Sequence, residues 1–593
     1  MAFPPGMRMS EIGCRPPGSI RVFMGMSVLG LRWLRSDFSK APLPLAALLA
    51  LAAVPAAAQL SLPPDYVWRQ FSPPGEPGSS VSFLWEVDRR GEWVVFVGDV
   101  ENTGAEAVYS RRRSGSELHR LSPYGPLGAV QSLELSIDGR FVIYRGDLET
   151  SGLDELWSAP IAGTPASAVK LNLPVTGAGV SGSTIPAAGG RIGYLAETAS
   201  GVGFWGVPVA GPAAASVRLD FDLTVEEQIY GGLVVSDSRV VLLIYNTTTG
   251  AVRLWSAPLA GPAAAGVSLL DAAPPGCIAF LVAASAQAER IAYALTCDTP
   301  VGDRTNQLWS VPMAGPASES VSLGGSFVEG GAIQSFSTSP DGQYMVLRAD
   351  KLVDERFELW SVPIAGPAGA MVRLNPALVA GGDVESSFDI SPDSTRVAYI
   401  ADQTTNETFR AWSVPIAGPS TLAVQLVSGI VAAGSDVTGL EFTPDSASIV
   451  FRADISQNDR FDLYSVPADG SATQDRITND SSIPGPDRST GTLWRFHPDG
   501  RRVVFTVDED APSDQRGLYE QRLSPRYVQD KRLNGDPVAG GRISTFEVFP
   551  DSAGTLYYSD ELVDGRFHLF TVDSRIFGDG FEEGTTAAWP DAP

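Results

Sequence analysis

Acidic side chains recur in pairs shortly after apolar runs along the chain. The pairs are Asp147 with Asp154, Asp350 with Asp354, Asp402 with Asn406, Asp454 with Asp459, Asp508 with Asp514, and Asp560 with Asp564. Grouped carboxylate oxygens are the ligands that Ca²⁺ prefers. Asp350, Asp354, Asp454, Asp459, Asp560 and Asp564 are therefore candidate calcium ligands. None has the dense D-x-D-x-D-G spacing of a calcium loop, and turn formation or solubility explains the same acids without a metal.

Residues suited to catalysis are few and scattered. The three histidines, His119, His497 and His568, lie far apart in sequence, and none has a metal-binding partner at helical spacing. The chain has no G-x-S-x-G, G-x-x-x-x-G-K-[ST], H-E-x-x-H or C-x-x-C motif. We therefore predict no catalytic residue, no cofactor-binding residue and no cofactor, with calcium as the open alternative.

Charge and composition exclude several classes of protein. The 593 residues include 43 Lys plus Arg against 68 Asp plus Glu, a net charge of -25. Nucleic-acid binding needs clustered cations, so we predict no nucleic-acid partner. The 44% of hydrophobic residues is too high for a disordered chain. With 61 glycines and 45 prolines, the composition favours turns and short strands.

The N-terminal region has the pattern of an export signal. Basic residues Arg32, Arg35 and Lys40 precede an apolar run at 43–54, and small residues follow up to Ala58. We predict a signal peptide over 1–58, with Met24 or Met26 as possible later starts. The apolar run is short for a membrane span and no other long one exists, so we predict an exported protein, periplasmic or secreted, without a membrane span.

Removal of that leader leaves two cysteines, Cys277 and Cys297. The apolar segments that carry them flank a polar turn at 285–289, and the midpoint of the two positions falls inside it. A hairpin folded there places the two cysteines opposite each other. An even count in an exported protein favours a disulfide, so we predict a cross-strand Cys277–Cys297 bond, with two buried thiols as the alternative.

A repeat organises the rest of the chain. Segments such as LWSAPLAGPA at 254–263 and LWSVPIAGPA at 359–368 are copies of one another, and each has an aromatic residue at the same place. These aromatics are spaced by 48 to 55 residues: Tyr109, Trp157, Trp205, Trp255, Trp309, Trp360, Trp412, Tyr464, Tyr519 and Phe570. Ten units therefore fill the chain after the leader.

Each unit contains four predicted strands, A to D. A second signature, [STHF]-P-D-[GS], as in SPDSTRVAYIAD at 391–402, is a turn between apolar runs. Within 381–431 we predict strand A at 386–390, B at 395–400, C at 410–415 and D at 423–427. Four-stranded units of this length, without an amphipathic helix, are typical of β-propeller blades. We predict an all-β fold of about ten such units, as one large ring or as two smaller rings in tandem.

The ends of the repeat region suggest how the ring closes. The last unit lacks a convincing D strand before Phe577, whereas the apolar segment 65–71 precedes the first A strand. We predict that segment 59–78 supplies the missing outer strand of the last blade, because a paired edge is protected from aggregation. The repeats then occupy 79–577, and 578–593 forms a C-terminal tail.

The Pro-Asp turns, the aliphatic B strands ending in Ala-Asp and the aromatic-Ser-Val-Pro C strands resemble the TolB-like, WD-like propeller repeats of exported bacterial proteins. The resemblance covers about 79–577. Such propellers commonly have six blades, whereas ten units are present here. Propeller peptidases of the prolyl-oligopeptidase type carry an additional hydrolase domain, which we do not expect here.

Nearly all residues are explained by the repeat, and the aromatic column is best explained as packing between blades. We therefore predict a non-enzymatic exported scaffold that binds a protein or cell-envelope component. The alternative is a carbohydrate-active or carbohydrate-binding propeller, of lyase or glycosidase type, with acidic residues at the central channel. The least repetitive connectors, 172–184, 271–276 and 479–487, are candidate binding segments. The sequence predicts no oligomeric state.

Overall fold

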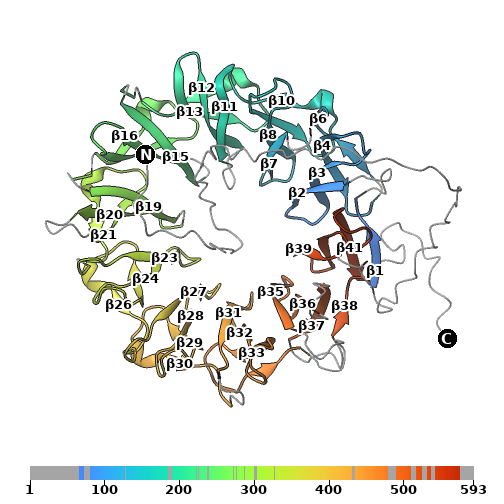
Figure 1. Cartoon of the computed structure of the whole chain (residues 1–593). Coiled ribbons are helices and arrows are strands. Elements are labelled where there is room, and N and C mark those ends of the chain that lie inside the picture. The colour runs from blue at the N-terminus through green and yellow to red at the C-terminus, as the bar shows by residue number, and fades with distance from the viewer. Residues whose placement is uncertain are drawn as a thin grey trace, which may run out of the picture.

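The computed structural model is a single ring of ten four-stranded blades (Figure 1). It describes residues 66–72 and 80–574, except 116, 127–128, 185–189, 222, 225, 237–238, 272, 275–276, 286, 299–303, 326, 430–433, 479–488, 509–515, 524–529, 536–537 and 539–540. The predicted all-β propeller is confirmed, and of the two arrangements left open by the sequence the structure has the single ring. The predicted leader (1–58) and the tail (578–593) lie outside the described residues.

The strands of each blade run antiparallel, from strand A at the inside of the ring to strand D at the outside. Blade 1 consists of β2 (Ser80–Val87), β3 (Trp93–Asp99), β4 (Ala105–Arg112) and β5 (Leu118–Arg120), with β6 (Gly125–Pro126) also paired to β4. Blade 2 is β7 (Val130–Leu135), β8 (Phe141–Gly146), β9 (Glu155–Pro160) and β10 (Val169–Lys170). Blade 3 is β11 (Val175–Thr184), β12 (Arg191–Thr198), β13 (Gly201–Pro208) and β14 (Val217–Arg218). Blade 4 is β15 (Glu227–Ser236), β16 (Arg239–Asn246), β17 (Val252–Pro258) and β18 (Val267–Leu270).

The next four blades continue the same order around the ring. Blade 5 is β19 (Cys277–Ser285), β20 (Arg290–Asp298), β21 (Arg304–Pro312) and β22 (Val321–Ser322). Blade 6 is β23 (Ile333–Thr338), β24 (Tyr344–Ala349), β25 (Glu358–Pro363) and β26 (Val372–Arg373). Blade 7 is β27 (Val384–Ile390), β28 (Arg396–Ala401), β29 (Arg410–Pro415) and β30 (Val424–Gln425). Blade 8 is β31 (Val437–Phe442), β32 (Ser448–Ala453), β33 (Asp462–Pro467) and β34 (Asp475–Arg476).

The last two blades bring the chain back to its start. Blade 9 is β35 (Ser489–Phe496), β36 (Arg502–Asp508), β37 (Arg516–Arg522) and β38 (Lys531–Arg532). Blade 10 is β39 (Ile543–Val548), β40 (Gly554–Ser559), β41 (His568–Ser574) and β1 (Tyr66–Gln70). The N-terminal strand β1 is thus the outer strand of the last blade, the pairing that we expected for 65–71. The backbone continues it, because the N–H of Phe71 donates to the carbonyl of Leu569 at 2.7 Å.

Turn chemistry explains the strand boundaries. In the A–B turn of blade 7, the Ser391 hydroxyl donates to Asp393 and accepts the N–H of Arg396, at 2.6 and 2.9 Å. Ser394 closes this turn with a positive φ of 64°. The predicted C strand is observed unchanged, but strand D is shorter than predicted. A short 3-10 turn, η6 (Ser420–Leu422), precedes it, and the observed strand β30 covers only Val424–Gln425.

Five similar 3-10 turns join strands C and D in blades 2 to 6. They are η1 (Pro165–Ser167), η2 (Ala213–Ala215), η3 (Ala263–Ala265), η4 (Ala317–Glu319) and η5 (Ala368–Ala370). In the repeated Ala-Gly-Pro sequence the glycine is required by its backbone, since Gly418, for example, has a φ of +69°.

The core is divided among the blade interfaces. Each of ten apolar clusters in the described part of the chain joins two neighbouring blades, and one of them joins blade 10 to blade 1. In that cluster Leu556 and Tyr558 of blade 10 pack with Val94 and Phe96 of blade 1. Burial of these faces drives folding, and it also makes the ring continuous.

The predicted disulfide is present. Cys277 and Cys297 are register partners on β19 and β20, and their sulfurs are bonded at 2.01 Å. Within the described ranges no helix is long and apolar enough to cross a membrane.

The contact between blades 10 and 1 differs from the others by its charge. Four residues after the C-strand aromatic, blades 2, 6 and 7 bury Ile161, Ile364 and Ile416, whereas blade 1 has Arg113. Its guanidinium lies 3.9 Å from the centre of the Phe549 ring. It also forms ion pairs with Asp551 and Asp573 of blade 10, each at 2.6 Å. A cation thus replaces an aliphatic side chain where the ring closes.

Loss of this cation should loosen the ring. We expect Arg113→Gln to destabilise the protein by about 1–3 kcal/mol, because it removes two ion pairs and a cation–π contact that are partly shielded from water. Arg140→Gln is the matched control. Its pair with Asp138 is 3.7 Å long and Arg140 is 79% exposed, so we expect a change within about 0.5 kcal/mol. Equal urea midpoints for the two variants would contradict this account of ring closure.

Candidate functional site

One end of the ring carries the loops between strands B and C (BC loops) and those between strand D and the next strand A (DA loops). Four BC loops begin with an aspartate that is only 2% exposed. We call Asp350, Asp402, Asp454 and Asp560 the clamp aspartates. They are members of the predicted acidic pairs, and burial of an acid requires hydrogen-bonding partners.

Each clamp aspartate accepts two backbone N–H groups. One oxygen accepts the N–H of a DA-loop residue: Ala332 at 2.5 Å, Asp383 at 2.6 Å, Asp436 at 2.6 Å and Arg542 at 2.7 Å. The other oxygen accepts the N–H five residues later: Glu355 at 3.0 Å, Glu407 at 2.9 Å, Asp459 at 2.8 Å and Gly565 at 2.9 Å. The clamp aspartates therefore fix their own loop and tie it to the DA loop.

The geometry of the donor residue explains the loop shape. Glu355, Glu407, Asp459 and Gly565 all have positive φ, between 56° and 77°. This left-handed conformation turns the chain that follows the donor back toward strand C. Asp99 and Asp147 of blades 1 and 2 accept the N–H of Gly104 and Gly152 in the same way, at 2.9 and 3.2 Å. Six blades therefore share this loop.

The aspartate and its hydrogen bond from the N–H five residues later recur in all six loops, whereas the residues at the loop tip differ. Two residues at the tip, the second and third after the aspartate, are exposed in all six loops. In blade order the tips are Glu101-Asn102, Glu149-Thr150, Leu352-Val353, Thr404-Thr405, Ser456-Gln457 and Leu562-Val563. We call these six dipeptides the display tips. A repeated rigid frame with variable exposed residues is the arrangement found in binding loops on scaffolds.

Adjacent loops are also joined across blades. The N–H of Phe357 in blade 6 donates to Asp383 of the next DA loop at 2.8 Å, and Phe409 in blade 7 donates to Asp436 at 2.8 Å. Asp383 and Asp436 are the same residues whose N–H groups meet clamp aspartates. This chain of hydrogen bonds runs through blades 6, 7 and 8 and holds their display tips in fixed relative positions.

The predicted calcium residues divide into two kinds. Asp350, Asp454 and Asp560 are clamp aspartates, whereas Asp354, Asp459 and Asp564 are exposed on the same loops. Asp354 lies against Gly330, where a Cβ would be 2.5 Å from its Oδ1. Asp459 lies five residues after its clamp aspartate, the position that Glu355 has in blade 6. Among the residues that the structure describes, no group of three or more potential ligands is placed to hold a metal. Calcium binding is untested.

The repeat aromatics lie between blades. Each belongs to, or packs against, the apolar cluster that joins its own blade to the preceding one. Several stack on the aromatic residue opposite them in strand B, such as Tyr464 on Phe451, with ring centres 5.5 Å apart. No stacked row of open aromatic faces results, since these rings are largely or partly covered by the neighbouring blade.

The three histidines lie in different blades. His497 is buried in the A–B turn of blade 9, with its Nε2 2.8 Å from Oε2 of the equally buried Glu520. His568 Nδ1 is 3.2 Å from the buried Ser72 hydroxyl at the ring closure, and burial lowers the pKa of His568, with help from Arg566. His119 lies 3.7 Å from Glu117. Each is placed as part of a local structural contact.

The acids of the inner strands join neighbouring blades. Oε2 of Glu86 in blade 1 accepts the N–H of Leu135 in blade 2 at 2.9 Å. Oδ2 of Asp389 in blade 7 accepts the N–H of Phe442 in blade 8 at 2.8 Å. Desolvation raises the pKa of Asp389 to about 6, opposed by hydrogen bonds from Phe442 and Ile390. Glu86 and Asp389, both on inner strands, thus each form a structural hydrogen bond between blades.

The irregular connectors are only partly described. In the first one, Asn172 is buried and bonds the backbone of Leu156 and Leu173 on either side, at 2.8 and 2.9 Å. It therefore shapes the connector. Parts of 271–276 and all of 479–487 lie outside the described residues.

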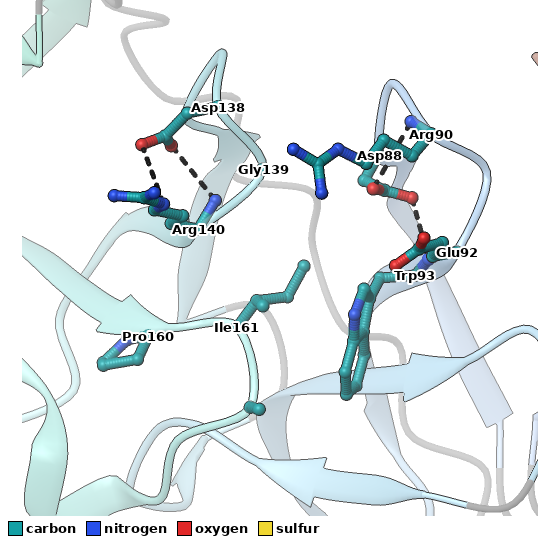
Figure 2. Close-up of a pocket in the computed structure, with 10 residues that line it drawn as sticks. Asp88, Arg90, Glu92, Trp93, Asp138, Gly139, Arg140, Pro160 and Ile161 are labelled. Atoms are coloured by element: carbon teal, nitrogen blue, oxygen red, sulfur yellow. Dashed lines mark hydrogen bonds and ion pairs between the residues drawn. The ribbon is translucent and has the colours of Figure 1, made fainter.

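A depression of about 360 Å³ lies at the opposite end of the ring, between the A–B turns of blades 1 and 2 (Figure 2). Blades 7, 8 and 10 have a serine in this turn whose hydroxyl bridges to the preceding blade, as Ser394 does to the Asp341 N–H at 3.0 Å. Blade 2 has Gly139 at that position. The bridging hydroxyl is missing at this interface, as it also is in blades 6 and 9, where Gly342 and Gly500 occupy the same position.

Asp88 and Asp138, which line this depression, accept hydrogen bonds within their own A–B turns. Asp88 accepts the N–H of Trp93 at 2.8 Å, and Asp138 accepts the N–H of Arg140 at 3.1 Å (Figure 2). Asp138 also accepts the Ser136 hydroxyl at 2.7 Å. Slight desolvation acts on the pKa of Asp138, but these hydrogen bonds and the Arg140 guanidinium lower it below its usual value. These hydrogen bonds favour the ionised form of Asp138, whereas an acid catalyst needs a raised pKa.

No family model and no curated protein matches the sequence. Solved structures with a similar fold include dipeptidyl peptidase 4 of Porphyromonas gingivalis, at 11% identity and a TM-score of 0.43 over 83% of this chain and 64% of that one. Prolyl oligopeptidase B of Galerina marginata matches at 12% identity, with a TM-score of 0.33 over 64% of this chain and 56% of that one.

A eukaryotic initiation factor matches at 12% identity and a TM-score of 0.39, over 72% of this chain and 94% of that one. The chain thus spans less than two thirds of the length of the two peptidases. Likenesses this weak say nothing about the activity of this chain. The TolB-like origin of the repeats stays a prediction.

The clamp can be tested with two neighbouring aspartates. Asp454→Asn replaces one accepting oxygen by an NH₂ group, so we expect a loss of about 1.5–3 kcal/mol and faster hydrogen exchange at the amides of Asp436 and Asp459. Asp459→Asn is the control, because the residue is exposed and asparagine tolerates its positive φ. We expect its melting temperature to stay close to that of the wild type. Similar losses for both variants would contradict the clamp.

The raised pKa of Asp389 should make the stability of the protein depend on pH. Because the folded pKa of Asp389 is raised to about 6, the folded protein holds this proton more tightly than the unfolded chain, and stability falls as pH rises from about 4 to 6. Asp389→Asn lacks that ionisation. We expect its melting temperature, relative to the wild type, to rise by about 1–2 °C between pH 4.5 and 7.5. A constant or falling difference would refute the raised pKa.

Proposed function

We propose that this protein is an exported, non-enzymatic β-propeller scaffold with TolB-like repeats, which binds another protein or a cell-envelope component through its display tips. The observation that carries the proposal is the constant clamp beneath variable tips. Six loops keep the aspartate and its N–H contact five residues later. The display tips between them differ from blade to blade, except in blades 6 and 10, which share Leu-Val.

A rigid loop loses little conformational entropy when it binds a partner. A flexible loop loses conformational freedom when it binds, which weakens the complex. In blades 6, 7, 8 and 10 a buried carboxylate accepts one hydrogen bond from the loop that carries the tip and one from the adjacent DA loop, so the tip is already fixed. A partner that contacts several tips therefore meets a pre-organised surface.

Export of the chain is part of the proposal. The Cys277–Cys297 bond supports it, since disulfides persist in oxidising compartments. The predicted leader supports it from the sequence. The acids described above support a scaffold over a carbohydrate-active propeller, because Glu86 and Asp389 accept backbone N–H groups between blades.

Site-specific crosslinking in the producing cell tests the binding face. A photoreactive amino acid at Thr404, a display tip of blade 7, should give a discrete crosslinked species that mass spectrometry identifies. Ser471 in the C–D turn of blade 8 is the matched control, because it is also exposed but lies at the opposite end of the ring. We expect no adduct there. Adducts at Ser471 alone would reject the display tips as the binding surface.

Enzyme activity is tested separately. We expect no turnover when the purified protein is incubated with a panel of glycans, pectins and peptides. Turnover that a single Asp or Glu substitution abolishes, with the melting temperature unchanged, would overturn the non-enzymatic scaffold and favour the carbohydrate-active or another catalytic alternative.

A further inference from the structure

Two of the six display tips are identical and apolar. Leu352 and Val353 of blade 6 are 53% and 52% exposed, and Leu562 and Val563 of blade 10 are 44% and 46% exposed. The tips of blades 1, 2, 7 and 8 consist of Glu, Asn, Thr, Ser and Gln. Exposed aliphatic residues on two loops are not required by the clamp, because the same clamp works with Thr404-Thr405 in blade 7.

The DA loops extend the apolar surface at both places. In blade 10 the N–H of Val538 donates to the carbonyl of Glu561 at 2.9 Å, next to the tip, and Val538 is itself 38% exposed. In blade 6 the N–H of Val328 donates to the carbonyl of Lys351 at 3.0 Å in the same arrangement, and Val328 is half-buried. Each place therefore presents a valine from the DA loop beside a Leu-Val tip. We call these two groups the apolar anchors.

Both anchors are held rigidly. Asp350 and Asp560 fix the backbone on either side of Leu352-Val353 and Leu562-Val563. Rigid exposed aliphatic side chains bind with little loss of entropy and are released from water on contact. The anchors lie in blades 6 and 10 of one ring (Figure 1), so a partner that touches both must extend across this end of the ring.

The clamped BC loops have more exposed acids than exposed cations, and Arg542 of the blade 10 DA loop is an exposed cation beside them. In the six clamped BC loops the exposed charged residues are seven acids and one arginine: Glu101, Glu149, Asp354, Glu355, Glu407, Asp459, Asp564 and Arg566. A second copy of this chain docked through the same face would bring these acids together, and a membrane with anionic headgroups would be repelled. Cationic groups are favoured at this surface.

We propose that the two apolar anchors and the acids around them bind a basic protein segment that carries aliphatic or aromatic side chains. This inference rests on the proposed scaffold function and names its partner class. The apolar anchors supply contacts that slow dissociation, and the acidic rim accelerates association and selects a cationic partner. The polar tips of blades 7 and 8 lie along the path between the anchors.

A peptide library tests the partner class. Random 15-residue peptides displayed on phage are selected on the full exported chain. We expect enriched peptides to have a net positive charge and at least two apolar side chains. Their affinity should fall at least tenfold between 50 and 500 mM NaCl. It should also fall at least tenfold for the variant Leu352→Ser, Val353→Ser, Leu562→Ser, Val563→Ser.

Matched substitutions provide the control. Thr404→Ala, Thr405→Ala, Ser456→Ala and Gln457→Ala change two polar tips, and we expect less than a twofold loss of affinity. Because all eight side chains are exposed, both variants should melt at the wild-type temperature. The inference is overturned if no peptide is enriched, if enriched peptides are neutral or acidic, or if they bind the serine variant as well as the wild type.

Two further outcomes separate this inference from the scaffold function. Binding of the wild type, but not the serine variant, to phosphatidylcholine vesicles would identify a membrane as the target and overturn the protein partner. Crosslinks at Thr404 to an acidic protein would leave the scaffold function intact and reject the basic partner. Enzymatic turnover on the substrate panel would instead remove the scaffold function, whatever the peptides show.

Discussion

Packing between neighbouring blades is the constraint on which this structure depends. A four-stranded sheet with an apolar face on both sides cannot bury either one alone, so each blade needs two neighbours. The ten apolar clusters meet that need around the ring, and the cluster of blades 10 and 1 completes it. The N-terminal strand β1, paired to β41, then ties the first part of the chain to the last.

The loops at the two ends of the ring are stabilised in different ways. At the A–B and C–D end, serines such as Ser394 and the compact Ala-Gly-Pro turns fill the space between blades. At the BC and DA end, buried carboxylates replace such packing as the stabilising element. Because a carboxylate acts on the backbone, the side chains of the loop tips are not needed for folding. That freedom makes this end the better place for a binding surface.

Blade 1 departs from the repeat in a consistent way. Its A–B turn has Arg89 and Arg90 where the turns of blades 6 to 10 have Pro-Asp, and Arg113 replaces an aliphatic residue. Arg113 is used at the closure with blade 10. The depression beside Arg90 arises at the interface with blade 2, where a bridging hydroxyl is lacking. Irregularity in this blade therefore reflects its position at the seam of the ring.

The sequence alone determined the elements and their order. The spacing of the aromatics gave ten units, the Pro-Asp turns located strands A and B, and the symmetry of Cys277 and Cys297 about a turn predicted their bond. These features are local, because turn chemistry and strand alternation act over a few residues. The pattern could not choose between one ring and two, since every unit makes the same kind of contact with its neighbour. The apolar cluster between blades 10 and 1 shows that the ten blades form one ring.

The roles of the acids were decided by tertiary structure alone. Asp350 and Asp354 look alike in the sequence, and both were candidate calcium ligands. In the fold Asp350 is buried against backbone N–H groups of Ala332 and Glu355, whereas Asp354 is exposed. The DA-loop donor lies 18 residues before Asp350, so no local pattern reveals the pair. The role of a carboxylate depends on which N–H groups lie beside it in the folded chain, and these come from residues distant in sequence.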